Sequence, residues 1–273
     1  MRESISHTSE AVTDLYDQTL AMEIIFGPDI HLGYWPEGVE DGLDNAQKRL
    51  TDLVAASAAP TAGTRILDVG CGTGGPARHI AATTGAAVTG VTISPKQVEV
   101  ALARNDDADV DFHVGDATDL PFAEAEFDAA VAIESLIHIA DKQRALNEVF
   151  RVLRPGATLV VADLTQSEGL LELTNAAQSD LRAMATLLSP SDYRNLVAQA
   201  GFEIVEVRDI GPRVRPSWAK LVERATDLRQ DVEAADSTRQ VTAVAGAFGA
   251  LGKGADAGFL GYVLLIARKP ASP

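Results

Sequence analysis

The sequence has a single cysteine, few basic residues and no long apolar run, and each shortage excludes a class of protein. Cys71 is the only cysteine among 273 residues, so neither an internal disulfide nor a multi-cysteine metal site can form. No run of about 18 apolar residues occurs, which excludes a membrane-spanning helix. The polar N-terminus lacks the apolar core of a secretion signal. We therefore expect a cytoplasmic protein without a membrane partner.

Basic residues are outnumbered by acidic ones, 23 against 39, and the net charge is −16. Because binding to nucleic acid depends on clustered lysine and arginine, this balance argues against a nucleic-acid partner. No pair of His, Asp or Glu residues has the helical spacing of a metal site, so we expect no metal either. The expected partner is a small-molecule acceptor, bound by a monomer or a homodimer.

What the sequence does contain is an apolar strand that runs into closely spaced glycines at residues 65–75 (RILDVGCGTGG). Gly70, Gly72 and Gly74 carry no Cβ, so the backbone there can approach a bound ligand closely. A helix that begins near Gly75 would direct its unpaired N–H groups into the same space. This arrangement is typical of a nucleotide-type cofactor site on a parallel α/β sheet.

Strand and helix patterns alternate after this turn, which predicts right-handed βαβ units and an α/β fold with helices on both faces of a parallel sheet. The expected strands are residues 65–69, 87–93, 110–114, 127–133, 158–162, 203–209 and 259–268, and the expected helices are 10–25, 43–56, 75–83, 95–103 and 142–152. The expected parts are an N-terminal helical lid (1–57), a cofactor-binding core (58–165), substrate-cap insertions with the sixth strand (166–258), and the last strand with a C-terminal tail (259–273).

The glycine turn is compatible with two kinds of cofactor. Gly70, Gly72 and Gly75 satisfy the Gly-x-Gly-x-x-Gly pattern of dinucleotide sites. However, no acidic residue ends the second strand to bind a ribose, and Asp68 would repel a pyrophosphate. A carboxylate at this place better fits a cofactor that carries an amine or a cation. Residues 67–74 (LDVGCGTG) resemble the first motif of class I S-adenosylmethionine-dependent methyltransferases.

The resemblance continues along the core. Residues 88–94 with Gln97 resemble the second strand of the small-molecule branch, residues 115–122 resemble the third motif, and residues 148–156 resemble the segment before the fifth strand. The resemblance implies a Rossmann-like, seven-stranded, mostly parallel sheet with an antiparallel last strand, with S-adenosyl-L-methionine as cofactor and S-adenosyl-L-homocysteine as product. The cofactor-binding residues that it implies are His31, Asp68, Gly70, Cys71, Gly72, Gly74, Thr92, Ile93, Gln97, Asp116, Ala117 and Glu134.

The same resemblance implies particular roles for some of these residues. Thr92 stands where many class I enzymes have an acidic residue for the ribose, and in this branch the backbone near Thr92 and Ile93 and the amide of Gln97 take that task. The Asp116 carboxylate accepts a hydrogen bond from the adenine amino group, and the Ala117 N–H caps the ring edge. By itself, Asp116 could equally be a turn or capping aspartate.

Methyl transfer to a hydroxyl group requires a positioned acceptor and often a base. Ligands of open α/β sheets bind at the carboxyl ends of the strands, where His138 follows the fourth strand and Asp163 ends the fifth. The pattern of residues 134–138 (ESLIH), together with residues 31–35 (HLGYW), resembles natural-product methyltransferases that modify sugars, polyketides or indole alkaloids. It implies that His138 is the base, with Asp163 orienting it or binding the acceptor. A packed, non-catalytic His138 is the alternative.

The acceptor site is expected among the N-terminal lid and the two insertions, 165–190 and 211–258. Tyr16 and the 31–35 turn would fold over the cofactor, and apolar side chains of the insertions would line the pocket. Ordinary helix packing explains the same side chains equally well. The candidate substrate-binding residues are Tyr16, Trp35, Met184 and Trp218.

We therefore predict an S-adenosylmethionine-dependent methyltransferase of natural-product or antibiotic biosynthesis that methylates oxygen on a small secondary metabolite. Two alternatives stay open. One is N-methylation of a small amine of the glycine or sarcosine type, which the acidic composition would suit. The other is a protein of the same fold that holds the cofactor as a structural element while it catalyses a cyclisation.

Overall fold

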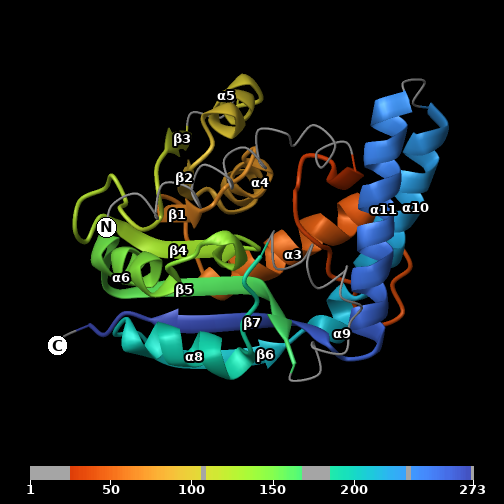
Figure 1. Cartoon of the computed structure of the whole chain (residues 1–273). Helices are drawn as coiled ribbons and strands as arrows, with labels where there is room; N and C mark the ends of the chain where they lie inside the picture. Colours follow the sequence, from red (N-terminus) through yellow and green to blue (C-terminus); the bar gives the residue numbers. More distant parts are fainter. Residues whose placement is uncertain (1–24, 106–108, 168–184, 232–234, 272–273) are drawn as a thin grey trace, which may run out of the picture.

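The computed structural model describes residues 25–105, 109–167, 185–231 and 235–271. Their centre is a seven-stranded sheet with the order β3-β2-β1-β4-β5-β7-β6 (Figure 1). Neighbouring strands from β3 to β5 pair in parallel, whereas β7 runs antiparallel to both β5 and β6, which confirms the predicted topology. The strands are β1 (Arg65–Val69), β2 (Ala87–Thr92), β3 (Val110–Val114), β4 (Phe127–Ile133), β5 (Leu153–Gln166), β6 (Glu203–Asp209) and β7 (Leu260–Arg268).

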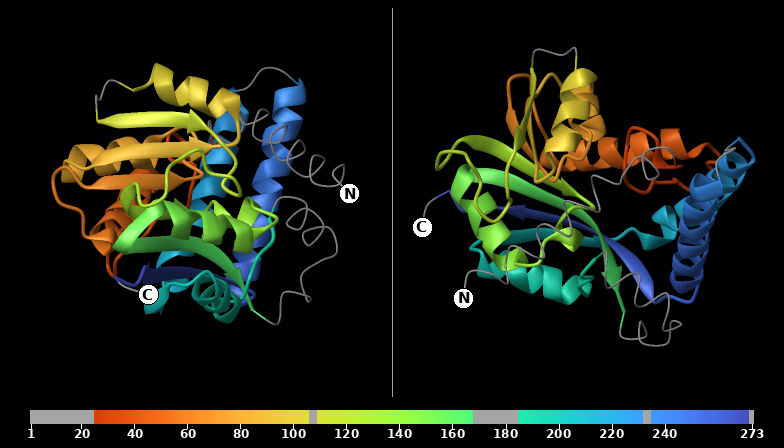
Figure 2. Two further views of the ribbon diagram at one scale, coloured as in Figure 1. Left: turned by 90° about the vertical axis from the view of Figure 1, so that its left-hand side faces the viewer. Right: turned by 45° about the horizontal axis from the view of Figure 1, so that its top comes forward.

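Helices cover both faces of this sheet (Figures 1 and 2). One apolar core joins the sheet to α3, α4, α5 and the α10–α11 pair, and a second core joins the opposite face to α6 and α8. The α10–α11 pair stands beside the ends of β5 and β7 and packs against α3 (Figure 1). The helices are α3 (Leu43–Ala58), α4 (Gly75–Thr84), α5 (Pro95–Ala103), η1 (Leu136–His138), α6 (Lys142–Val152), α8 (Pro190–Gln199), α9 (Gly211–Val214), α10 (Pro216–Asp231) and α11 (Ala235–Asp256).

Short polar side chains determine where several helices begin. The Ser94 hydroxyl accepts the Gln97 N–H at 3.2 Å before α5, and Asp141 caps α6 in the same way. Ser189 and Asp192 form a reciprocal capping box at the start of α8. Each of these caps satisfies backbone N–H groups that the first turn of a helix leaves unpaired. The cap at Ser94 lets α5 begin at Pro95, shortly after β2 ends at Thr92.

The strand segments differ in burial according to their place in the sheet. β1 is almost wholly buried, and its successive side chains, such as Ile66 and Leu67, enter opposite cores. β6 alternates between exposed and half-buried positions because it is an edge strand with only one partner. The glycine turn therefore follows a strand that is held on both sides by β2 and β4.

The sequence-based boundary of the fifth strand was wrong. β5 spans Leu153–Gln166 rather than 158–162, because its pairing with β7 continues to Gln166 opposite Leu260. Asp163 therefore lies inside the strand and does not end it. The predicted helical character of residues 211–258 is confirmed by α9, α10 and α11. Most of the 10–25 helix and of the 165–190 insertion lies outside the described residues, and the division into four parts stays a prediction.

No helix in the described part of the chain is both long enough and apolar enough to span a membrane.

Candidate active site

The glycine turn after β1 combines tight packing with one open side. Gly70, Gly72 and Gly74 all have positive φ, at 78°, 54° and 79°, a conformation that side chains with a Cβ rarely adopt. A Cβ on Gly70 would collide with Ser135, and one on Gly74 would collide with the Phe112 ring. A Cβ on Gly72 would meet none of the described residues within 4 Å. The turn is therefore tightly packed at Gly70 and Gly74, whereas Gly72 faces space that no described residue fills.

Asp68, the residue before the last of β1, carries a carboxylate that the described residues satisfy only in part. Its side chain is 2% exposed, and among the described residues no hydrogen-bond partner reaches its Oδ2. Burial raises its pKa to about 7. An unpaired, buried carboxylate oxygen is costly, so this atom fits a ligand that brings a cationic N–H donor. Burial also raises the pKa of the neighbouring Cys71 thiol well above its usual value, which is consistent with Cys71 as an apolar filler.

The end of β2 holds a hydrogen-bonded pair of side chains. The Thr92 hydroxyl donates to Gln97 Oε1 at 2.6 Å, and both residues are buried. This bond turns the two N–H groups of the Gln97 amide away from Thr92 and toward other acceptors. Ile93 follows in a half-buried position, and Ser94 then starts α5. The group matches the arrangement that the resemblance implies for ribose binding, and that role stays a prediction.

Asp116 and Ala117 lie in the turn that follows β3. Asp116 is exposed, and its Oδ1 accepts hydrogen bonds from the Thr118 N–H and hydroxyl, both at 2.8 Å. The aspartate thus stabilises its own turn, as the simpler interpretation of the sequence required. Ala117 is half-buried beside it. Contact of either residue with an adenine ring is a prediction that these bonds do not test.

Glu134 connects the end of β4 to the N-terminal segment. Its φ of 49° is unusual for a residue with a side chain, and its Oε1 accepts the Leu32 N–H at 2.8 Å and the Tyr262 hydroxyl at 2.9 Å. Burial is the main cause that raises its pKa, to about 8. The next residue, Ser135, donates its hydroxyl to Val69 O at 2.5 Å. The end of β4 therefore supports both the glycine turn and the segment that passes over it.

The segment with His31 and Trp35 is packed into the core. His31 is 2% exposed, its Nδ1 lies 2.7 Å from Leu32 O, and burial lowers its pKa. Trp35 is buried, and its backbone N–H donates to the backbone oxygen of Arg213, in α9, at 2.8 Å. These positions favour the packing interpretation, and contact with cofactor or acceptor stays a prediction for both. Tyr16 and Met184 lie outside the described residues.

The two candidate bases lie in different surroundings. His138 is half-buried at the end of η1, the three-residue turn that follows β4. Its backbone N–H donates to Ser135 O at 3.1 Å. Asp163 is fully buried, and its Oδ2 accepts the Ile137 N–H at 3.1 Å and the Tyr193 hydroxyl at 2.8 Å. The carboxylate of Asp163 therefore lies inside the protein and accepts from donors of the chain, which favours an orienting role, and both roles of Asp163 stay predictions.

Comparisons with known proteins agree with this geometry. Residues 67–161 match the family model described as a methyltransferase domain. The 27-O-demethylrifamycin SV methyltransferase of Amycolatopsis mediterranei is 37% identical over 268 residues, which cover 96% of this chain and 95% of the relative. The chain is a class I S-adenosylmethionine-dependent methyltransferase. It belongs to the natural-product branch of that family.

Two further relatives show the range of chemistry around this methyltransferase. The O-methyltransferase cnsE of Penicillium expansum is 40% identical over 216 residues, covering 77% of this chain and 78% of the relative. The crystal structure of the [4+2]-cyclase SpnF is 32% identical, with a TM-score of 0.82 and coverage of 96% of both chains. Family membership is thus shown, whereas the reaction of each relative is a property of that relative.

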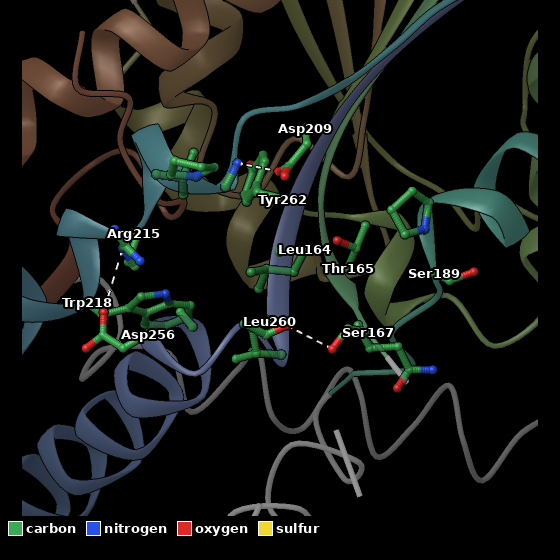
Figure 3. A pocket seen from close by; sticks show the side chains of 18 residues that line it. Leu164, Thr165, Ser167, Ser189, Asp209, Arg215, Trp218, Asp256, Leu260 and Tyr262 are labelled. Atoms are coloured by element: carbon green, nitrogen blue, oxygen red, sulfur yellow. Dashed lines mark hydrogen bonds and ion pairs between the residues drawn. The ribbon is translucent and has the colours of Figure 1, made fainter. Parts of the chain in front are cut away.

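The methyltransferase has a cavity of about 530 Å³ at the edge of the sheet where β5 ends and β7 begins (Figure 3). Leu164, Trp218 and Tyr262 supply much of its apolar wall, and Trp218 comes from the predicted cap insertion. Arg215 lines one side, paired with Asp256 through an Nε–Oδ1 distance of 3.6 Å. The cavity lies on the same edge of the sheet as the glycine turn, which is where parallel α/β sheets bind ligands.

Sequence reasoning missed three residues that surround the candidate site. Tyr262 donates to Glu134 from the last strand, Tyr193 donates to Asp163 from α8, and Lys142 donates to backbone carbonyls of the η1 region from α6. None of them belongs to a motif. Only the packing of distant elements brings them together, so no local pattern in the sequence could have identified them.

Proposed function

We propose that this methyltransferase methylates a hydroxyl group of a bulky secondary metabolite, with S-adenosylmethionine as the methyl donor. The observation that carries the choice of donor is the unpaired Oδ2 of buried Asp68 beside the open side of Gly72. The choice of acceptor is supported by the relatives, because one is named for 27-O-demethylrifamycin SV and another is named as an O-methyltransferase, both at 37% identity or more.

The residues present fit this cofactor at three places. Asp68 Oδ2 would accept from the ammonium group of the methionine part, which removes the cost of leaving a buried oxygen unpaired. The backbone at Gly72 would lie against the cofactor without a side chain between them. The Gln97 amide, held by Thr92, would donate to the ribose hydroxyls. When bound, S-adenosylmethionine would supply a methyl group on a sulfonium: the acceptor oxygen would bond to the methyl carbon as the carbon–sulfur bond breaks in line, with S-adenosylhomocysteine as the leaving group.

His138 then removes the proton of the acceptor hydroxyl. A neutral imidazole nitrogen accepts that proton from the hydroxyl. The η1 turn holds His138 at the carboxyl end of β4, one strand away from the glycine turn of β1. The half-buried position of His138 limits the water around the transferred proton.

One specific observation favours a second candidate function. The [4+2]-cyclase SpnF matches 96% of this chain at 32% identity, so a methyltransferase fold of this kind is associated with cyclisation in a near relative. In that case Asp68 and the glycine turn would still bind the cofactor, and the acceptor would rearrange without gaining a methyl group. The small-amine alternative lacks such support, since Arg215 is the one arginine among the residues that line the described cavity and it is paired with Asp256.

The test begins with calorimetric titration of S-adenosylmethionine and S-adenosylhomocysteine into the protein. Absence of binding by either ligand would overturn the proposal. Methyl-labelled cofactor is then incubated with 27-O-demethylrifamycin SV as a probe acceptor, and label in the probe supports O-methylation of this class. Label in glycine or sarcosine, but not in the probe, would instead support the amine alternative. A probe that changes its structure without a change in mass would support cyclisation.

A substitution at His138 tests its role as the base. His138→Gln should bind the cofactor as the wild type does, while turnover of the probe falls by about 10²–10⁴-fold, the usual range for loss of a general base. His79→Gln is the matched control, because His79 pairs with Asp52 between α3 and α4 and lies outside the η1 turn. Equal turnover in both variants would show that the transfer needs no histidine base.

A further inference from the structure

Three buried polar side chains form a hydrogen-bonded network around Ile137 of the η1 turn. Asp163 of β5 accepts the Ile137 N–H at 3.1 Å, and Tyr193 of α8 donates its hydroxyl to the same Asp163 oxygen at 2.8 Å. Lys142, at the start of α6, donates its Nζ to Ile137 O at 3.4 Å and to Ile139 O at 2.8 Å. Side chains from other elements thus bind both the N–H and the C=O of Ile137, and the C=O also accepts the backbone N–H of Thr186 at 2.8 Å.

These three polar side chains are buried in an apolar environment, which makes their desolvation costly. Asp163 is 0%, Tyr193 1% and Lys142 5% exposed, and the surrounding core consists of apolar residues such as Leu136 and Leu146. Burial raises the pKa of Asp163 to about 7 and lowers that of Lys142 to about 8. Apolar side chains of similar size would fill this space at lower cost. A buried polar network of this kind specifies a single arrangement of the groups that it contacts.

The turn that receives these bonds is short, and its backbone is held both from within and by the Thr186 N–H, which donates to Ile137 O at 2.8 Å. η1 consists of three residues, and its own backbone bonds are His138 N–H to Ser135 O and Ile139 N–H to Leu136 O, both at 3.1 Å. A single 3₁₀ turn has poor hydrogen-bond geometry and is rarely stable without outside contacts. The orientation of the Ile137 peptide sets the direction of the backbone that enters His138.

We propose that Tyr193, Lys142 and Asp163 are positioning residues that hold the Ile137 peptide, and with it His138, in the geometry needed for proton removal. This inference rests on the proposed function of His138 as base. None of the three residues needs to touch the acceptor or the cofactor. Their effect is on distance and angle, and a displacement of about 1 Å at a reacting group can reduce a rate by about 10²-fold.

Tyr193→Phe separates positioning from stability, because it removes one hydroxyl and keeps the ring. Ionised Asp163 loses a hydrogen bond, so its pKa should rise by about one unit. The groups that face Asp163 are Tyr193 from α8 and Lys142 from α6, with Glu134 of β4 and Tyr262 of β7 at longer range. Turnover of the probe acceptor should fall about fivefold at pH 7 and less than about twofold at pH 8.5, where Asp163 ionises again.

Two controls keep this test decisive. Val197→Ala removes buried packing from the same helix without touching the network, so it should lower the melting temperature and leave the shape of the pH profile unchanged. Lys142→Met keeps the buried stem and removes the charge next to Asp163, so it should shift the profile in the same direction as Tyr193→Phe. A Tyr193→Phe profile that superimposes on the wild type would overturn the proposal.

Hydrogen exchange gives a readout that does not depend on the reaction. The Ile137 amide should exchange faster in Tyr193→Phe than in the wild type, measured by mass spectrometry on a peptide that spans the η1 turn, and Val197→Ala should not change it. Equal exchange in the three proteins would overturn the network. If the wild type transfers no methyl group to any acceptor, the proposed function fails, while the exchange result still decides whether the network holds the turn.

Discussion

Asp68 should destabilise the free protein at alkaline pH, and its replacement by asparagine should show this. The folded-state pKa is raised by burial to about 7 from 3.8, so the folded protein binds the proton more tightly than the unfolded chain does. Stability therefore falls as pH rises from about 4 to about 7, and the cost above pH 7 reaches about 4 kcal/mol at 1.36 kcal/mol per pKa unit. An amide at this place has no charge to desolvate.

We expect Asp68→Asn to raise the free energy of unfolding of the cofactor-free protein at pH 8 by about 1–3 kcal/mol, since two new amide donors that need partners offset part of the gain. At pH 5 the folded carboxyl is protonated and the unfolded one is ionised, so the stability of the variant relative to the wild type should be about 2.5 kcal/mol lower than at pH 8. The same variant should bind S-adenosylmethionine about 10–100-fold more weakly, because the ammonium group loses its charged acceptor. Urea denaturation at both pH values and calorimetric titration measure these two effects.

Asp128→Asn is the matched control for the sign of the effect. Asp128 accepts hydrogen bonds from the Arg65 N–H and from Arg154, and its pKa is lowered by them against the opposing effect of burial. Loss of its charge should therefore lower stability at pH 8. If Asp68→Asn were also less stable than the wild type at pH 8, the carboxylate would have a partner in the free protein, and the argument that Oδ2 awaits a cationic ligand would be refuted.

The other predictions concern the turn and the ribose site. Gly70→Ala should lower stability by about 2–4 kcal/mol, because its methyl group would collide with Ser135 at a positive φ. Gly72→Ala should lower stability by only about 1–2 kcal/mol, the cost of the left-handed conformation, and should weaken cofactor binding more than about tenfold if the cofactor lies there. Thr92→Val should weaken cofactor binding by about 1 kcal/mol, since Gln97 loses the bond that orients its amide. Thermal unfolding and calorimetric titration of each variant test these values, and a Gly72→Ala protein with wild-type affinity would contradict the assigned site.

The central features of the fold could be predicted because they depend on local patterns. The apolar run of β1 and the glycines after it are adjacent in the sequence, and the collisions at Gly70 and Gly74 explain why no other residue fits. The extension of β5 to Gln166 could not be predicted in the same way. Its last residues include Asp163, Thr165 and Gln166, which look like a polar loop until the pairing with β7 and the packing of α8 are known.

In the candidate site, too, residues that belong to local motifs could be predicted, and residues brought in by distant elements could not. Asp68 was identified from its neighbours in the sequence, whereas Tyr193 and Lys142 reach the η1 turn from elements that lie elsewhere in the chain. Sequence reasoning left two roles open for Asp163, orienting His138 or binding the acceptor, because the tyrosine that donates to its carboxylate belongs to no motif. The position of a polar residue at a strand end indicates that it is near a site, and only its partners indicate what it does there.

Asp68 and Asp163 show why partners decide between these roles. Both are carboxylates of neighbouring parts of the sheet, both are at most 2% exposed, and burial raises the pKa of each to about 7. A perturbed pKa therefore does not distinguish them. Asp163 receives donors from Ile137 and Tyr193, so its charge is used to hold the protein together. Asp68 keeps an oxygen that the described residues leave unpaired, and a cationic donor bound there would offset the cost of burying it.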